Sequence, residues 1–453
     1  MKLKHSIVAV LMTAVAFTAC KKDKNTGGES SGTIEITNGG NLTGTFKKDQ
    51  HVVVRRGTIT LTGYTYFEEG ASLTIEPGTV IKSSTSNKGA LIMERGSKIM
   101  AEGTAQAPIV FTSGRPVGER TPGDWGGIIL LGKATVNATN PTIEGGVGRQ
   151  YGGNVDNDNS GSLKYIRIEF AGIAAELNSE INGLTLGGVG SGTTLEHIMV
   201  AYGNDDAFEF FGGTVNAKYL VAYATADDDF DFDNGYKGKI QFAVSLRDPE
   251  FVDGGDAGNG IECDNNASGS DAAPRTRPNL SNFTILGPNG AANTAANHNF
   301  ANRFRRNTAF VLNNSILLGH PDGGLSLESN GTYNAFIDGT SEFKNNILYA
   351  LAAPFKMGSD VTVAGASAAA IEAKATAAGT VKLTSSAGAG LTNAFSLTSP
   401  NFLPAVGSVA LTGASFTGDQ TDSFFEKVAY KGAFGAVNWT TGWASWTPKT
   451  NVY

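Results

Sequence analysis

Short apolar runs with alternating polar positions recur along most of the chain, separated by turns rich in glycine, asparagine and aspartate. The clearest pair is at residues 206–210 (DAFEF) and 228–232 (DDFDF), offset by 22 residues, and each copy follows an apolar run. An earlier pair, at residues 67–78 and 93–103, repeats at an offset of 26. Alternation with a period of two predicts strands of about three to five residues between these turns.

A repeat of this length predicts one coil of a solenoid, in which each coil pairs only with its neighbours. Leucine-rich repeats have similar periods, but their leucine spacing is absent, and a β-sandwich does not repeat in this way. The sequence therefore predicts an all-β protein, built as a single-stranded, right-handed parallel β-helix.

The two ends of such a solenoid need protection against edge-to-edge pairing. We expect residues 33–60 to form an N-terminal cap, residues 61–358 the coils, and residues 359–453 a C-terminal excursion with a cap. Within the excursion, residues 366–378 (ASAAAIEAKATAA) predict one short helix that ends at Gly379. Most of the tryptophans lie near the C-terminus, as expected of a cap over the last coil.

The N-terminus predicts export. Two lysines precede an apolar run that is shorter than the about 20 residues of a spanning helix. Cys20 follows directly after small residues, so residues 1–19 resemble a bacterial lipoprotein signal peptide. The resemblance implies cleavage before Cys20, lipid attachment to this residue, and a flexible tether at residues 20–32. Lys21, in place of an aspartate that favours retention in the inner membrane, implies an outer-membrane location.

Composition and charge narrow the choice of partners. The net charge of -7 argues against nucleic-acid binding, which needs a basic surface for the phosphates. Two cysteines in 453 residues exclude a disulfide scaffold. Cys263 has no disulfide partner if Cys20 is lipidated, and we expect it to be a buried thiol.

Acidic residues concentrate between Asn204 and Asp233, where Lys218 is the only basic residue. Because neighbouring coils are about 4.8 Å apart, the 22-residue offset places Asp231 over Glu209. Extended to other coils, the predicted outward row is Thr185, Glu209, Asp231, Glu262 and Ser326.

Like charges on neighbouring strands are destabilising, and a hard cation such as calcium relieves the repulsion by binding clustered carboxylates. The candidate calcium ligands are Asp205, Asp206, Glu209, Asp228, Asp229 and Asp231. Two other interpretations stay open at this point: a solvated acidic face, and a pair of catalytic carboxylates.

Three further residues are candidates for binding a ligand. Tyr202 and Tyr223 are candidates for stacking on sugar rings, with packing at turns as the alternative. Arg247 is a candidate for contacting an acidic glycan. We expect the basic cluster at residues 303–306 (RFRR) to provide counter-ions for the acidic face.

Several phrases resemble the β-helix surface lipoproteins of the Bacteroidetes, which are of the pectin-lyase-like type. These are residues 73–81 (LTIEPGTVI), residues 123–128 (GDWGGI), the lipoprotein signal and the closing aromatic segment at residues 430–446. The resemblance implies the fold and the outer-membrane location, but no activity.

The leading hypothesis is a non-catalytic surface module that binds a glycan or a neighbouring envelope protein. The alternatives are a polysaccharide lyase or glycoside hydrolase that uses the acidic face, and a structural spacer or adhesin. Residues 203–206 (GNDD) resemble the paired aspartates of polygalacturonases, but no Gly-His-Gly or Arg-Ile-Lys motif follows.

Overall fold

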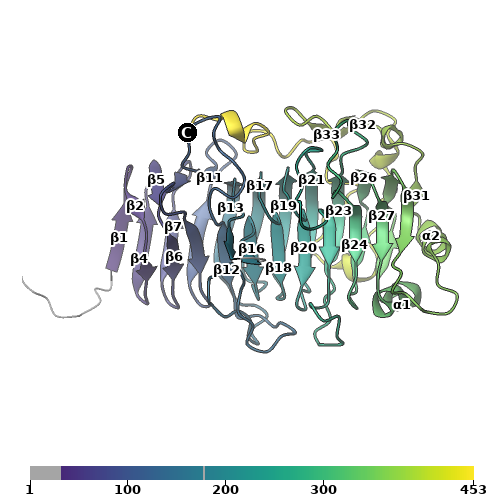
Figure 1. Ribbon diagram of the computed structural model, residues 1–453, viewed down its shortest axis with the longest axis horizontal. Helices are drawn as coiled ribbons and strands as arrows, with labels where there is room; N and C mark the ends of the chain where they lie inside the picture. The colour runs from purple at the N-terminus through teal and green to yellow at the C-terminus, as the bar shows by residue number, and fades with distance from the viewer. Residues whose placement is uncertain (1–31, 177–178) are drawn as a thin grey trace, which may run out of the picture.

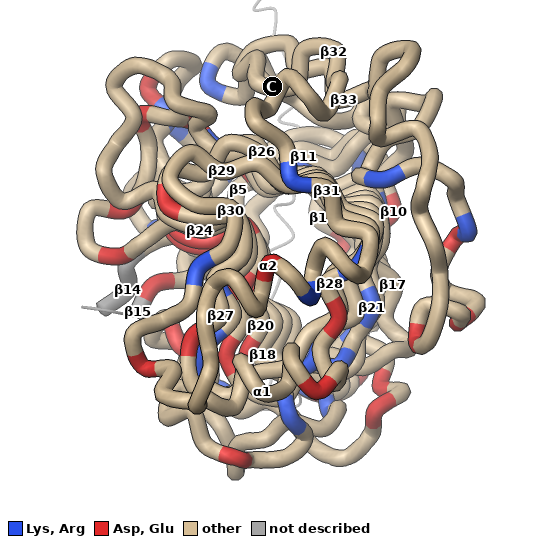
Figure 2. The backbone as a smooth tube through the Cα atoms, turned by 90° about the vertical axis from the view of Figure 1, so that its right-hand side faces the viewer, with Lys and Arg blue, Asp and Glu red and all other residues tan. Residues whose placement is uncertain are grey.

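The computed structural model describes residues 32–176 and 179–453, so the predicted signal peptide and Cys20 lie outside the described residues. The chain winds through three parallel sheet faces in successive coils, and the strands of these faces pair with strands one coil away (Figure 1). The prediction of an all-β parallel β-helix is confirmed. Viewed along the axis, the coils superimpose (Figure 2).

The strands fall into three faces and two small hairpins. Face 1 contains β1 (Gly32–Ile36), β4 (Gln50–Val54), β7 (Ser72–Ile75), β10 (Lys98–Glu102), β25 (Val311–Asn313) and β28 (Glu342–Lys344). Face 2 contains β2 (Asn41–Leu42), β5 (Thr58–Leu61), β8 (Val80–Ser83), β11 (Ile109–Ser113), β26 (Ile316–His320), β29 (Ile347–Ala350) and β31 (Val381–Lys382). Longer strands belong to both faces: β13 (Gly161–Glu169), β17 (Thr194–Ala201), β19 (Asn216–Tyr223), β21 (Lys239–Leu246) and β23 (Asn279–Leu286).

Face 3 contains β3 (Thr45–Phe46), β6 (Tyr64–Phe67), β9 (Ala90–Met93), β12 (Ile128–Leu131), β16 (Leu184–Gly187), β18 (Phe208–Phe211), β20 (Phe230–Asp233), β22 (Ile261–Cys263), β24 (Phe300–Phe304), β27 (Gly323–Leu327) and β30 (Ala353–Met357). The two hairpins are β14 (Ala174–Glu176) with β15 (Ser179–Glu180), and β32 (Leu391–Asn393) with β33 (Asn401–Pro404).

The long strands bend at the corner between faces 1 and 2. At each bend one residue other than glycine takes a left-handed conformation, which turns the chain without ending the strand. In successive coils these residues are Tyr165, His197, Tyr219, Phe242 and Asn282, with φ between 51° and 62°.

The interior of the solenoid is filled by side chains that stack from coil to coil. Phe208 packs on Phe230 with ring centroids 5.4 Å apart, and Phe210 packs on Phe232 at 5.0 Å. All four side chains are fully buried, which confirms the inward orientation that the alternation predicted.

The N-terminal region, predicted as a cap, consists of strands that continue the sheets of the coils. Residues 33–60 form β1 to β4 and most of β5, which pair in parallel with the coil that follows. The physical reason is that this segment keeps the same alternation as the coils. Val52, Val54 and Ile59 point into the common core and are buried.

Two helices lie at the C-terminal end of the solenoid. The predicted helix is α2 (Ala368–Ala377), which begins after Ser367 and is followed by Gly379 in a left-handed conformation. Ile371 and Ala375 are buried in the core of the coils, so α2 covers the last coil. A second helix, α1 (Asn330–Asp338), was not predicted. Neither helix is long and apolar enough to cross a bilayer within the described part of the chain.

Residues 383–453, here called the C-terminal strap, run back along the outside of the solenoid toward its N-terminal end (Figure 1). The strap contains the short turns η1 (Ser386–Ala389), η2 (Val409–Leu411), η3 (Gly418–Thr421) and η4 (Pro448–Thr450). Trp443 is fully buried against Tyr165 and His197. The tryptophans therefore cover the corner between faces 1 and 2 instead of the last coil, because that corner presents a column of aromatic rings.

Candidate cation-binding cleft

The coil repeat stacks carboxylates on the outer side of face 3. Strand pairing places Thr185 beside Glu209, Glu209 beside Asp231, and Asp231 beside Glu262. This part of the predicted outward row is confirmed. The prediction missed one coil, because Arg303 stands between Glu262 and Ser326.

The turns that lead into these strands bring four more aspartates to the same place. Asp205 and Asp206 precede β18, and Asp227 and Asp228 precede β20 one coil later. The backbone N–H of Asp228 donates a hydrogen bond of 2.8 Å to Asp206 Oδ1, which holds the two turns in register. Asp228 Oδ1 in turn accepts a 2.6 Å hydrogen bond from the backbone N–H of Asn259.

Loops outside the coils complete the wall. Glu144 comes from the long loop after β12, Glu180 from the β14–β15 hairpin, and Asp256 from the loop before β22. The result is a cleft of about 170 Å³, here called the acidic cleft, which has no lysine or arginine among its described lining residues. Its lining is Glu144, Glu180, Asn182, Asp205, Asp206, Glu209, Asp227, Asp228, Asp231, Asp256, Ala257 and Glu262.

Burial and mutual repulsion oppose the ionisation of these carboxyl groups. Burial raises the pKa of Asp206 well above its usual range, and the charges of Asp227 and Asp228 add to the increase. Burial and the charge of Asp256 raise the pKa of Asp227 to about 7. Burial also raises the pKa of Glu262, to about 8, although Arg305 acts in the opposite direction. Ionising the cleft at neutral pH therefore costs free energy unless a positive charge enters it.

The positions of the oxygen atoms fit a hard divalent cation. Two sets of three carboxylates have oxygens within 4.8 Å of one another, and Asp206 belongs to both; the sets are Asp205, Asp206 and Asp227, and Asp206, Glu209 and Asp231. Calcium–oxygen bonds are about 2.3–2.6 Å long, so oxygens on opposite sides of one ion are about 5 Å apart. Asp231 Oδ1 is buried and has no hydrogen-bond partner among the described residues.

Asp229, one of the six candidate calcium ligands, does not line the acidic cleft. Its side chain is fully buried and points into the solenoid, where Oδ1 accepts a 3.0 Å hydrogen bond from Thr225 Oγ1. The guanidinium group of Arg247 lies 3.7 Å away. Asp229 thus belongs to an internal ion pair, whereas the other five candidates surround the cleft.

The three residues expected to bind a ligand are also buried. Tyr202 packs against Tyr223 and lies under the ammonium group of Lys449. The hydroxyl of Tyr223 donates a hydrogen bond of 2.8 Å to the backbone oxygen of Leu397 in the strap. Because the strap covers these rings, neither is available to stack on a sugar.

The side chain of Arg247 is buried inside the protein. Its guanidinium group donates hydrogen bonds to the backbone oxygens of Thr225, Asp227 and Asn259. These oxygens belong to the turns that carry the acidic residues. Arg247 therefore supports the wall of the acidic cleft from the inside and does not reach a ligand in solution.

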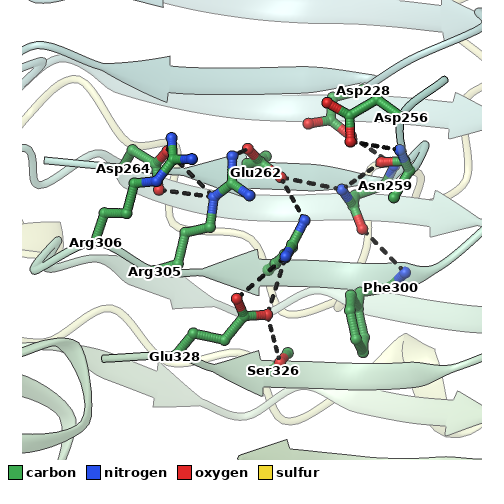
Figure 3. Close-up of polar contacts among 12 residues, drawn as sticks. Asp228, Asp256, Asn259, Glu262, Asp264, Phe300, Arg305, Arg306, Ser326 and Glu328 are labelled. Carbon is green, nitrogen blue, oxygen red and sulfur yellow. Dashed lines mark hydrogen bonds and ion pairs between the residues drawn. The ribbon is translucent and has the colours of Figure 1, made fainter. Parts of the chain in front are cut away.

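The basic cluster at residues 303–306 contacts carboxylates at and beside the acidic cleft, as expected of counter-ions; Figure 3 shows Arg305 and Arg306 beside Glu262 and Asp264. Arg305 pairs with Glu262 and with Asp264, the latter at 3.0 Å. Arg303 lies between Glu262, at 3.4 Å, and Glu328, at 2.9 Å. These arginines neutralise Glu262 and its neighbours but are absent from the described lining around Asp206.

Sequence reasoning missed Glu144, Glu180 and Asp256 as parts of the site. They lie on loops that have no repeat, so no offset relates them to β18 and β20. Asp227 stood in the acidic run but was not selected. Cys263 is a buried free thiol beside Thr308 Oγ1, as predicted. Cys20, the predicted lipid-attachment residue, lies outside the described residues.

Comparison with known proteins agrees with the parallel β-helix fold. A family model described as a pectate-lyase-like β-helix domain matches residues 44–399. The chain belongs to this family. The match covers every coil from β3 to β30 and extends into the strap. No curated protein and no solved structure matches the chain.

Proposed function

We propose that this pectate-lyase-like β-helix protein is a lipoprotein of the outer membrane that binds calcium in the acidic cleft and binds an acidic glycan without cleaving it. The observation that carries the proposal is the cleft itself, in which ten carboxylates meet without a lysine or arginine among the described lining residues. Calcium takes six to eight oxygen ligands, so an ion held by three carboxylates keeps positions for water or for glycan oxygens.

A binding role is supported over a lyase by the positions of the basic residues. A lyase needs a base beside the bound uronate. Arg247, the candidate from the sequence, is fully buried and donates to backbone oxygens on the inner side of the turns. Arg303 and Arg305 reach Glu262 but are held in ion pairs with Glu262, Asp264 and Glu328. A cleft of about 170 Å³ holds an ion and a few waters, since one water occupies about 30 Å³.

A glycoside hydrolase is the second candidate. Burial raises the pKa of Glu262 to about 8 against the opposing effect of Arg305, and a raised carboxyl pKa is what a general acid requires. Hydrolysis also needs a second carboxylate at a suitable distance, and Asp231 is the neighbour on the next strand. Product analysis distinguishes this candidate from binding alone.

The first experiment is calcium titration of the full chain by isothermal calorimetry, after dialysis against EDTA. Wild type should bind calcium, and Asp206→Asn should lose binding because Asp206 belongs to both carboxylate sets. Glu119→Gln, which removes an exposed carboxylate elsewhere, is the matched control and should bind like wild type. Absence of calcium binding by wild type would overturn the proposal and leave the spacer or adhesin hypothesis.

The glycan is tested next, with polygalacturonate and a neutral galactan as probes. Retention of polygalacturonate that requires calcium, with an unchanged length distribution, supports the proposed function. Shortened chains or new unsaturated ends would instead show an enzyme.

Membrane anchoring is tested separately. The lipoprotein signal at residues 1–19 and Cys20 supports it. Wild type should partition into the detergent phase, and Cys20→Ala should move to the aqueous phase. Equal partitioning of both proteins would contradict lipid attachment at Cys20.

A further inference from the structure

A second cleft lies on the other side of face 3, where this face turns into face 1 of the next coil. Its volume is about 550 Å³, within the range of about 300–1,000 Å³ typical of small-molecule sites. One wall consists of the turns after β6, β9 and β12, which provide Glu69, Arg95 and Lys133. The other wall is the loop at residues 148–155.

The three turns stack directly on one another. A Cβ atom added to Gly96 would lie 2.9 Å from both Glu69 Cγ and Lys133 Nζ. Lys133 Nζ forms an ion pair of 2.6 Å with Glu69. The charged groups of successive coils are therefore held side by side along this wall.

The opposite wall adds a second, well-oriented ion pair. Arg149 Nε lies 2.7 Å from Glu94 Oε1, and its guanidinium group lies over the ring of Tyr66 at 4.5 Å. Contact with both a carboxylate and an aromatic face restricts the side chain. Two of the three cations in this cleft are thus neutralised by carboxylates.

Arg95 forms no direct ion pair with a carboxylate among the described residues, although its charge acts on Glu69 at longer range. Its guanidinium group donates to the backbone oxygen of Gly152 at 3.1 Å and to Gln150 Oε1 at 3.5 Å, and both partners are neutral. A guanidinium group has five N–H donors, so further donors remain for a ligand. The cleft has three cations and two carboxylates among its charged lining residues, on a protein whose net charge is -7.

We propose that this cleft, here called the Arg95 cleft, binds a short acidic saccharide whose carboxylate or sulfate ester contacts Arg95. Arginine recognises such planar or tetrahedral oxyanions through charge-assisted hydrogen bonds. The ligand hydroxyls would donate to Glu69 and Glu94 and accept from Gln150 and Asn154, which the lining supplies. The inference rests on the proposed glycan binding, but it needs no calcium.

The test is calorimetry on the full chain in EDTA, which removes calcium and so prevents calcium-dependent binding in the acidic cleft. The probes are digalacturonate, a sulfated disaccharide, inorganic sulfate and neutral lactose. We expect at least one acidic disaccharide to bind and lactose not to bind. Whichever of digalacturonate and the sulfated disaccharide has the higher affinity identifies the anionic group. Arg95→Gln should lower the affinity at least tenfold, while Arg95→Lys should retain part of it and Arg56→Ala, a change at an exposed arginine elsewhere, should have no effect.

The two proposals fail in different ways. Asp206→Asn should abolish calcium binding and leave saccharide binding in EDTA unchanged. Equal binding by wild type and Arg95→Gln, equal binding of lactose, or binding of inorganic sulfate alone would each overturn the Arg95 cleft as a saccharide site. None of these outcomes depends on calcium, so they leave the proposed function of the acidic cleft to its own test.

Discussion

Two columns of side chains on this solenoid have the same geometry and opposite energetics. At the corner between faces 1 and 2, Tyr165, His197 and Tyr219 stack with ring centroids 4.3 and 4.4 Å apart. On face 3, Glu209 and Asp231 stand on neighbouring coils in the same way. Stacking favours aromatic rings, whereas like charges at this spacing repel.

The two columns are completed by different partners. The strap covers the aromatic column: Trp443 packs edge-on against Tyr165 and His197, at 6.0 and 5.7 Å. The acidic column has no such cover within the described chain, and a cation is the partner that its charge calls for. The repeat thus produces a covered aromatic interface at the corner between faces 1 and 2. On face 3 it produces a cluster of carboxylates without a positively charged partner around Asp206 among the described lining residues.

The largest expected effect comes from opening the aromatic column. Trp443→Ala removes a fully buried indole, so the free energy of unfolding should fall by about 3–5 kcal/mol. Denaturant unfolding followed by circular dichroism measures the change. A loss below 1 kcal/mol would mean that the strap does not stabilise the corner.

Calcium bound at the acidic column should increase the stability of the protein, whereas Trp443→Ala decreases it. At a free calcium concentration about 100 times the Kd, the free energy of unfolding should rise by about 2.7 kcal/mol. Asp206→Asn should remove this gain, because the shared ligand of both carboxylate sets loses its charge. Thermal unfolding in calcium and in EDTA measures this calcium-dependent gain in stability, with Glu119→Gln as the control.

Without calcium, stability should decrease as the pH rises from about 5 to 8. The pKa of Asp227 is raised to about 7 and that of Glu262 to about 8, so the folded state holds these protons more tightly than the unfolded state. Stability is therefore highest below the ordinary carboxyl pKa and is lost as the pH passes through 7 and 8. Saturating calcium should flatten this dependence, and urea midpoints at pH 5, 6, 7 and 8 check it.

The smallest expected effect is the reverse pH dependence of the aromatic column. Burial lowers the pKa of His197 to about 4, so the unfolded state binds the proton more tightly. Stability should fall by about 1 kcal/mol as the pH drops from 6.5 toward 4, a modest value because the ring is only partly buried. His197→Phe should abolish this loss while retaining the stack. An identical acid dependence in both proteins would exclude His197 as its source.

The coil repeat made much of the structure predictable from the sequence. The alternation at residues 206–210 and 228–232 predicted which side chains point inward, and the 22-residue offset predicted that Asp231 lies over Glu209. The helix at residues 366–378 was predicted because alanine-rich sequence and a stop at Gly379 agree locally, and the structure adds Ser367 as its N-cap. The N-terminal residues 33–60, predicted as a cap, carry the same alternation as the coils and pair in parallel with them.

Features that depend on contacts between distant segments were not predictable. Glu144 and Glu180 reach the acidic cleft on loops without a repeat, and nothing in their sequence relates them to Asp206. The sequence left two roles open for Tyr202 and Tyr223, stacking on sugars or packing at turns. It could not decide between them because the strap residue Leu397, which bonds to Tyr223, lies more than 170 residues later. Asp228 and Asp229 are adjacent in the turn before β20, yet Asp228 lines the acidic cleft and Asp229 pairs with the buried Arg247.

The sequence by itself determined the coil, its period and the row of carboxylates, because strand alternation and a fixed offset act locally and repeat. Only the tertiary structure decided which acidic side chains form a common cleft, where the strap lies and that Arg95 bonds to neutral partners in its cleft. The reason is that these depend on loops and a C-terminal segment folding back over the solenoid, whose contacts are set by shape and charge at long range.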